Sequence, residues 1–170
     1  MPLNIPNSLT WARIALIPFF VGIYYFPDNV ISPDDKNLIA TLTFIVAAVT
    51  DWFDGYLARS LGQTSAFGAF LDPVADKLMV AAALIVLVQL GRVDSLIALV
   101  IIGREITISA LREWMAKVGA AGSVAVAFVG KLKTAAQMSA IPLLLFEAPV
   151  LGFDSLQRGT LLIYVAAVLP

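Results

Sequence analysis

Four aspartates lie close together between two long apolar segments, at positions Asp51, Asp54, Asp72 and Asp76. The first two are three residues apart and the last two are four apart, so each pair shares one face if its segment is helical. A carboxylate at the centre of a membrane costs about 2.5–3.5 kcal/mol, so these side chains need partners. Carboxylate oxygens suit hard divalent cations, and two Mg²⁺ ions balance four negative charges. The spacing therefore indicates a divalent-cation site.

The segment between the two pairs is short and contains Gly62, which predicts a break between two helices. Helices joined by a short turn run antiparallel, so we expect the two carboxylate pairs to face each other across one crevice. Gly55, Ala58 and Gly68 lie among the aspartates. These small residues are compatible with close helix packing, with room for a ligand, or with both.

Each aspartate also has an ordinary structural explanation. Asp72 precedes Pro73 and could cap the beginning of a helix, since proline is favoured at the first helical position. The first pair could form ion pairs with Arg59 or Lys77. Four such coincidences in one short stretch are much less expected than one, so the cation site is the favoured interpretation.

The composition predicts an integral membrane protein. The chain has 170 residues, of which 60% are hydrophobic and only 14% are charged, whereas about a quarter of a soluble domain is charged. It contains no cysteine and no histidine, which excludes disulfides, thiolate sites and histidine-based catalysis. Any bound metal must therefore have oxygen ligands, which favours Mg²⁺, Mn²⁺ or Ca²⁺.

The apolar segments predict an all-α, polytopic membrane protein with a single domain over residues 1–170. A short interfacial segment is expected at residues 2–7, with Asn7 or Ser8 capping the first helix. The last segment is shorter than the roughly 20 residues that cross a bilayer, so this helix is partial or the chain is shortened. The predicted helices cover residues 8–26, 36–61, 65–90, 95–117, 129–146 and 156–169.

The basic residues predict the orientation in the membrane. With the N-terminus in the cytoplasm, eight of the eleven lysines and arginines lie on or toward the cytoplasmic side. This placement puts all four aspartates on the same side, where nucleotides and phosphorylated metabolites occur. The eight residues are Arg13, Arg59, Lys77, Arg104, Arg112, Lys117, Lys131 and Lys133.

A second group of charged residues lies later in the chain, at Arg104, Arg112, Lys131 and Lys133. Basic side chains within apolar segments are rare and suit a phosphate monoester, which arginine can bind through two hydrogen bonds. The alternative is that Glu105 and Glu113 pair with the arginines while the lysines only follow the charge bias of cytoplasmic loops.

The aspartate stretch resembles the signature of the CDP-alcohol phosphotransferases at all eight fixed positions: Asp51, Asp54, Gly55, Ala58, Arg59, Gly68, Asp72 and Asp76. The segments NIPNSLTWARIALIPFF, REITISALREWMA and GKLKTAAQ also look like the bacterial phosphatidylglycerophosphate synthase branch. The resemblance covers about residues 4–140 and implies a bundle of six transmembrane helices in the bacterial inner membrane, with the site facing the cytoplasm.

The resemblance implies transfer of a phosphatidyl group from CDP-diacylglycerol to sn-glycerol 3-phosphate, with release of CMP. It implies that the four aspartates hold two Mg²⁺ or Mn²⁺ ions and that Asp76 is also the general base. Cation binding lowers the basicity of a carboxylate, so Asp76 needs one oxygen off the metal, or the metal must itself acidify the hydroxyl. Gly55, Ala58 and Gly68 would make room for the nucleotide, with Arg59 beside the diphosphate.

The resemblance further implies that basic residues hold the acceptor phosphate, which would be Arg104, Arg112, Lys131 and Lys133 in this chain. Membrane lipids and a homodimer are further expected partners, and nucleic acid is not. Two other acceptor or function classes stay open: inositol phosphate as the acceptor, and a divalent-cation transporter. The transporter is disfavoured because no carboxylates recur along a path through the later helices. A structural protein stabilised by metal would leave the basic group unexplained.

Overall fold

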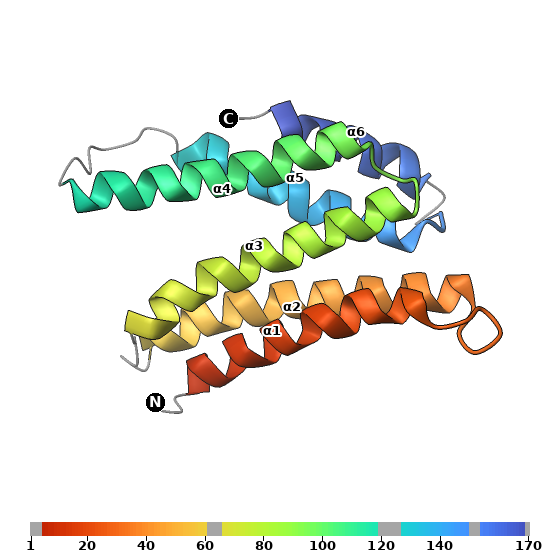
Figure 1. Cartoon of the computed structure of the whole chain (residues 1–170), viewed down its shortest axis with the longest axis horizontal. Coiled ribbons are helices and arrows are strands. Elements are labelled where there is room, and N and C mark those ends of the chain that lie inside the picture. Colours follow the sequence, from red (N-terminus) through yellow and green to blue (C-terminus); the bar gives the residue numbers. More distant parts are fainter. Residues whose placement is uncertain (1–4, 61–65, 119–126, 150–153, 169–170) are drawn as a thin grey trace. The chain divides into compact units, whose positions relative to one another are not determined.

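The computed structural model describes the backbone of residues 5–60, 66–118, 127–149 and 154–168, and side chains within 9–53, 70–118, 130, 132–149 and 154–168. All regular elements in these ranges are helices, which confirms the all-α prediction (Figure 1). They are α1 (Ile5–Gly22), the 3₁₀ helix η1 (Ile23–Tyr25), α2 (Pro33–Ser60), α3 (Ala66–Gln89), α4 (Ser95–Lys117), α5 (Ala127–Phe146) and α6 (Ser155–Val168).

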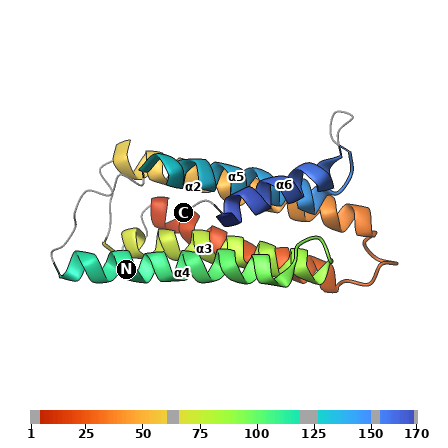
Figure 2. The same ribbon diagram turned by 90° about the horizontal axis from the view of Figure 1, so that it is seen from above.

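The chain forms two compact units, which we describe separately. The first unit comprises Met1–Val86 and Leu145–Glu147, and therefore contains α1, α2 and most of α3. The second unit comprises Leu87–Leu144 and Ala148–Pro170, with α4, α6 and most of α5. Within the first unit α1 packs against α2, and α2 and α3 run in opposite directions, as the sequence predicts (Figures 1 and 2). Within the second unit α4 packs against α6.

Two predicted helix boundaries follow from local chemistry. Gly91 has a φ of 70°, a left-handed conformation that glycine adopts without steric cost. Its N–H donates to Val88 and the N–H of Arg92 donates to Leu87, so two carbonyls at the end of α3 are satisfied. Asp94 then begins α4, because its side chain accepts a hydrogen bond of 2.8 Å from the backbone N–H of Leu96.

The first helix begins earlier than the sequence predicts. Residues 5–7 belong to α1, so Asn7 and Ser8 lie inside the helix and the prediction that one of them caps it is wrong. Pro6 permits the earlier beginning, because proline lacks only an N–H that the first helical turn does not use. Of the predicted interfacial segment at residues 2–7, the first three lie outside the described residues.

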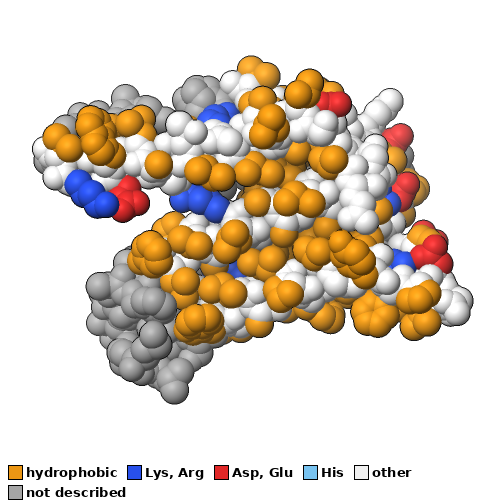
Figure 3. Space-filling model, in the orientation of Figure 1, with side chains coloured by type: hydrophobic (Ala, Val, Ile, Leu, Met, Phe, Trp, Pro, Cys, Tyr) orange, Lys and Arg blue, Asp and Glu red, His pale blue; other side chains and the backbone are white. Residues whose placement is uncertain are grey.

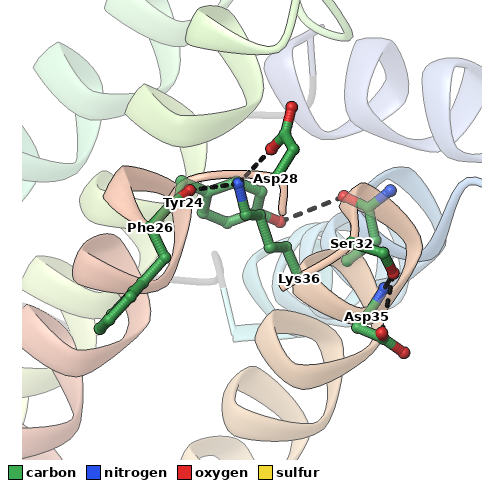
Figure 4. A network of polar contacts seen from close by, with 7 residues as sticks. Tyr24, Phe26, Asp28, Ser32, Asp35 and Lys36 are labelled. Atoms are coloured by element: carbon green, nitrogen blue, oxygen red, sulfur yellow. Dashed lines mark hydrogen bonds and ion pairs between the residues drawn. The ribbon is translucent and has the colours of Figure 1, made fainter. Parts of the chain in front are cut away.

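A buried lysine fixes the connection between η1 and α2 (Figure 4). The Lys36 ammonium donates to the carbonyl oxygen of Phe26 at 2.6 Å and to the Asp28 carboxylate at 2.5 Å. Ser32 precedes α2, and its hydroxyl accepts from the N–H of Asp35 at 3.2 Å while donating to the Asp35 carboxylate at 2.7 Å. This reciprocal capping explains why α2 begins at Pro33 rather than at the predicted Lys36.

The first unit has an apolar core, but it also buries several polar side chains and exposes several apolar ones. An exposed stripe on α2 consists of Leu38, Leu42, Ile45 and Val49, whose spacing of three or four residues places them on one face. Much of the surface visible in Figure 3 is apolar. Polar residues with buried side chains in this unit are Thr10, Arg13, Lys36, Asn37, Thr41 and Thr43.

Within the described ranges, one segment, Pro33–Phe53, is long and apolar enough to cross a membrane by length and composition. Shorter apolar helical segments occur at Leu9–Tyr25 and Leu132–Phe146. Six membrane crossings therefore stay a prediction.

Close packing and helix capping organise the second unit. A Cβ atom added to Gly159 would lie 2.6 Å from Cγ of the fully buried Leu144, so α6 contacts α5 at a point where only glycine fits. Arginine side chains satisfy carbonyls near helix C-termini, which lack partners within their own helix. Arg92 donates to the Leu144 carbonyl oxygen at 3.0 Å, near the end of α5.

Candidate functional site

Asp51 on α2 forms an ion pair with Arg13 on α1. Nη1 of Arg13 lies 2.6 Å from Oδ1 of Asp51. The Arg13 side chain is 2% exposed, whereas that of Asp51 is 43% exposed. A buried guanidinium needs a compensating charge, and Asp51 supplies one. The bond constrains one carboxylate oxygen while Asp51 still reaches the surface of the unit.

Asp72 on α3 accepts a hydrogen bond from Thr10 on α1. Thr10 Oγ1 lies 2.6 Å from Asp72 Oδ1, and Thr10 is 1% exposed. Asp72 and Pro73 lie inside α3, which extends from Ala66, so the alternative in which Asp72 caps a helix is wrong. A short hydrogen bond to a carboxylate is stronger than one between neutral groups, and it orients this side chain.

These two contacts place Asp51 and Asp72 at one turn of α1. Thr10 and Arg13 are three residues apart in the helix, so their Cβ atoms lie about 5–6 Å apart on one face. Each of them holds a carboxylate from a different helix. One turn of α1 thus holds one member of each aspartate pair, and the expectation that the two pairs face each other stays a prediction.

Other predicted members of the aspartate site are less fully described. Asp76 lies one turn after Asp72 on α3 and is partly exposed. Asp54, Gly55, Ala58 and Arg59 lie within α2 and Gly68 within α3, but their side chains are outside the described residues. Among the side chains that are described, no three carboxylates form a group that could hold a metal ion. The ligand chemistry of Asp51 and Asp72 fits a hard cation, because both residues offer carboxylate oxygens and are only partly buried.

The predicted basic group lies in the second unit. Nζ of Lys133 on α5 donates to Oε1 of Glu105 on α4, and Lys133 is 8% exposed. Glu113 forms its ion pair with Lys117, one turn later on α4, at 2.8 Å. The carboxylates proposed as partners for the arginines therefore contact lysines.

The two arginines of this group differ in environment. Arg104 donates to the carbonyl oxygens of Ala166 at 2.9 Å and Ala167 at 3.3 Å, at the end of α6. Arg112 is exposed, and within the described residues it forms no ion pair. The side chain of Lys131 is outside the described residues. Arg112 thus has more freedom to receive an anion than Arg104, which also stabilises a helix end.

Sequence reasoning missed Thr10 and Arg13 as members of the aspartate site. In the sequence, Arg13 was counted only among the basic residues that predict the orientation in the membrane. An arginine inside an apolar segment nevertheless implies a buried partner. Thr10 is one turn away on the same face. This spacing was the available signal, but it does not identify the partners.

Comparison with known proteins identifies the family. The sequence model of the CDP-alcohol phosphatidyltransferase family matches residues 3–169. A Pectobacterium atrosepticum protein named CDP-diacylglycerol–glycerol-3-phosphate 3-phosphatidyltransferase is 52% identical, over 99% of this chain and 90% of its own length. Proteins with the same name from Sodalis glossinidius and Escherichia coli K12 are each 50% identical, with the same coverage. The chain therefore belongs to the CDP-alcohol phosphatidyltransferase family.

Proposed function

We propose that this protein transfers the phosphatidyl group of CDP-diacylglycerol to sn-glycerol 3-phosphate, producing phosphatidylglycerol phosphate and CMP. The proposal is supported by relatives named for this reaction, which match nearly the whole chain at about half of all positions. The structural observation that carries it is the anchoring of Asp51 and Asp72 on one turn of α1. Two carboxylates from different helices are thereby oriented by side chains of α1.

Asp51, Asp54, Asp72 and Asp76 are proposed to hold Mg²⁺ or Mn²⁺, with two ions per site. When bound, such ions neutralise the diphosphate and the negative charge that develops on departing CMP. The chain contributes oriented carboxylates: Thr10 holds Asp72 and Arg13 holds Asp51. Positioning and charge neutralisation are the main demands of phosphoryl-type transfer on a protein.

Asp76 is the proposed general base. A hydroxyl oxygen of glycerol 3-phosphate forms a bond to the phosphorus of the phosphatidyl group, and the bond from that phosphorus to the CMP oxygen breaks. The hydroxyl proton passes to a carboxylate oxygen of Asp76, which must lie within hydrogen-bond reach. Asp76 is partly exposed in the first unit, so a substrate hydroxyl can approach it.

Room for the CDP group is proposed at Gly55, Ala58 and Gly68, whose short side chains allow close approach of a nucleotide. Arg59 is proposed to contact the diphosphate, since a guanidinium can form two parallel hydrogen bonds to phosphate oxygens.

The acceptor phosphate is proposed to bind the basic group of the second unit. Arg112 is exposed there, and Lys133 is held in place by Glu105. Arg104 and Lys131 complete the proposed set. Two or more cationic side chains favour a phosphorylated acceptor over a neutral alcohol, because each phosphate oxygen can accept a charge-assisted hydrogen bond.

Membrane insertion is proposed from the surface of the first unit. The exposed stripe of Leu38, Leu42, Ile45 and Val49 would be unfavourable in water and suits lipid chains. We place the protein in the bacterial inner membrane as a multi-pass protein, surrounded by membrane lipids, with the aspartates facing the cytoplasm. A homodimer stays a prediction from the resemblance.

A CMP-release assay with different acceptors tests the proposed reaction. Purified protein receives CDP-diacylglycerol and Mg²⁺ with sn-glycerol 3-phosphate, inositol phosphate, serine or no acceptor. We expect CMP release only with glycerol 3-phosphate, because serine lacks a phosphate group for the basic side chains and the relatives are named for transfer to glycerol 3-phosphate. Release with inositol phosphate in its place would refute the acceptor. Movement of Mg²⁺ across vesicle membranes without CMP release would favour the transporter.

A further inference from the structure

We propose that Arg13 is a built-in counter-ion of the aspartate site, which positions Asp51 and lowers the affinity of the site for divalent cations. This inference rests on the proposed cation site. It adds a positioning residue on α1, outside the eight signature positions, that sets how tightly the cation is held.

The first argument for this role is the burial of Arg13. Its side chain is 2% exposed, so water cannot solvate the guanidinium charge, and Nη1 bonds Asp51 Oδ1 at 2.6 Å. Asp51 itself is 43% exposed. The arginine is therefore fixed inside the unit, whereas the carboxylate reaches the surface of the unit. An arriving cation must share Asp51 with a charge that cannot move away into solvent.

The second argument is the neighbouring contact between Thr10 and Asp72. Asp72 is held by Thr10, one turn from Arg13 on α1, so both carboxylates are bonded to the same turn of this helix. Thr10 is neutral and orients Asp72 without opposing a cation. Arg13 orients Asp51 and also repels a cation, because like charges repel and a buried charge is weakly screened by salt. The two anchors thus have the same geometric role and different electrostatic effects.

Two effects of removing Arg13 oppose each other. Loss of the hydrogen bond frees the Asp51 side chain, which weakens cation binding slightly because one rotamer must be ordered. Loss of the positive charge removes repulsion toward a doubly charged ion, and this effect is larger at short range in a poorly screened site. We therefore expect tighter cation binding. An ion pair that only joins α1 to α2 would affect stability without tightening the site.

Mn²⁺ binding to the purified full chain in detergent, without substrate, tests the inference. Free Mn²⁺ is measured by electron paramagnetic resonance for the wild type, Arg13→Gln and Arg13→Lys. We expect Arg13→Gln to lower the Kd for Mn²⁺ about tenfold or more, and Arg13→Lys to stay within about threefold of the wild type because it keeps the charge. Lys36→Gln is the matched control, since Lys36 is also buried and paired with a carboxylate. It precedes Asp51 by about four helical turns on α2 and should leave the Kd unchanged.

Thermal unfolding of the same proteins gives a second readout. A ligand raises Tm more when it binds the folded state more tightly, so Mn²⁺ should raise the Tm of Arg13→Gln more than that of the wild type. This comparison also works if Arg13→Gln is unstable without Mn²⁺. Unchanged or weaker Mn²⁺ binding by Arg13→Gln, with no larger rise in Tm, would overturn the inference.

Asp72→Asn separates failure of this inference from failure of the proposed cation site. If Asp72→Asn abolishes Mn²⁺ binding while Arg13→Gln leaves the Kd unchanged, the cation site stands and the role of Arg13 is refuted. If the wild type binds no Mn²⁺, or Asp72→Asn has no effect on binding, both the cation site and the role of Arg13 are refuted.

Discussion

Asp72→Asn is expected to lower kcat/KM for phosphatidyl transfer about 10³-fold or more while the protein stays folded. Asparagine has nearly the same shape, and its amide oxygen can still accept the hydrogen bond from Thr10. The substitution therefore removes the negative charge and preserves the contact. A metal ion supplies several kcal/mol of transition-state stabilisation, and each 1.36 kcal/mol corresponds to a tenfold change in rate. Initial rates of CMP release at several Mg²⁺ concentrations measure the effect.

Asp94→Asn is the matched control for this substitution. Asp94 caps α4 by accepting a hydrogen bond from Leu96, and asparagine is an equally good capping residue. The same chemical change there should leave both activity and stability close to the wild type. Activity of Asp72→Asn within about tenfold of the wild type would contradict the metal role of this carboxylate.

The second large effect is expected from Arg112→Ala, which should raise the KM for glycerol 3-phosphate about tenfold or more with little change in kcat. A hydrogen bond between charged groups contributes about 1.5–3 kcal/mol, which corresponds to a tenfold or greater change in affinity. Arg112 is exposed and forms no ion pair within the described residues, so its removal leaves no buried charge there without a partner. Steady-state kinetics at saturating CDP-diacylglycerol separate the two parameters.

Lys117→Ala provides a comparison on the same helix. Lys117 is an exposed cation like Arg112, but it already contacts Glu113 at 2.8 Å. Its removal tests whether general positive charge near the end of α4 is enough to attract the acceptor. An equal rise of KM in both variants would assign the effect to long-range electrostatics, and an unchanged KM in Arg112→Ala would remove this residue from the acceptor site.

Helix positions were predictable from sequence because the length of an apolar segment, its hydropathy and the residues that end or cap a helix are local features. Gly91 ends α3 and Asp94 caps α4, and both follow from the conformational and hydrogen-bonding preferences of those residue types. The early beginning of α1 was not predicted, because the prolines and asparagines before Ser8 suggested an irregular segment. Proline in a first helical turn has little cost, so Pro6 does not mark a boundary.

The composition of the aspartate site was predictable only in part. Regular spacing relates residues of one helix, and it predicts one pair of aspartates within α2 and another within α3. The side chains that hold the aspartates come from α1. Arg13 and Asp51 are 38 positions apart in the sequence, and Thr10 and Asp72 are 62 positions apart. Helix packing determines such contacts, and no local pattern encodes them. A buried arginine demands a partner, but several carboxylates could meet that demand.

The basic group illustrates the same limit. Glu105 was considered as a partner for an arginine, whereas the structure shows it paired with Lys133 from α5. Arg104 contacts carbonyl oxygens near the end of α6, more than 60 positions away. Every residue has a backbone carbonyl oxygen, so the residue types at a helix end do not show which side chain will donate a hydrogen bond to it.

Transfer of labelled sn-glycerol 3-phosphate into lipid is the most direct test of the proposed reaction and its metal dependence. Purified protein is incubated with CDP-diacylglycerol and the labelled acceptor, with Mg²⁺ or with a chelator, and the label in the lipid phase is compared with released CMP. We predict one labelled lipid for each CMP released, no transfer in the chelator, and recovery when Mg²⁺ or Mn²⁺ is restored. Release of CMP without labelled lipid, or transfer that persists in the chelator, would contradict the proposed function of the aspartate site.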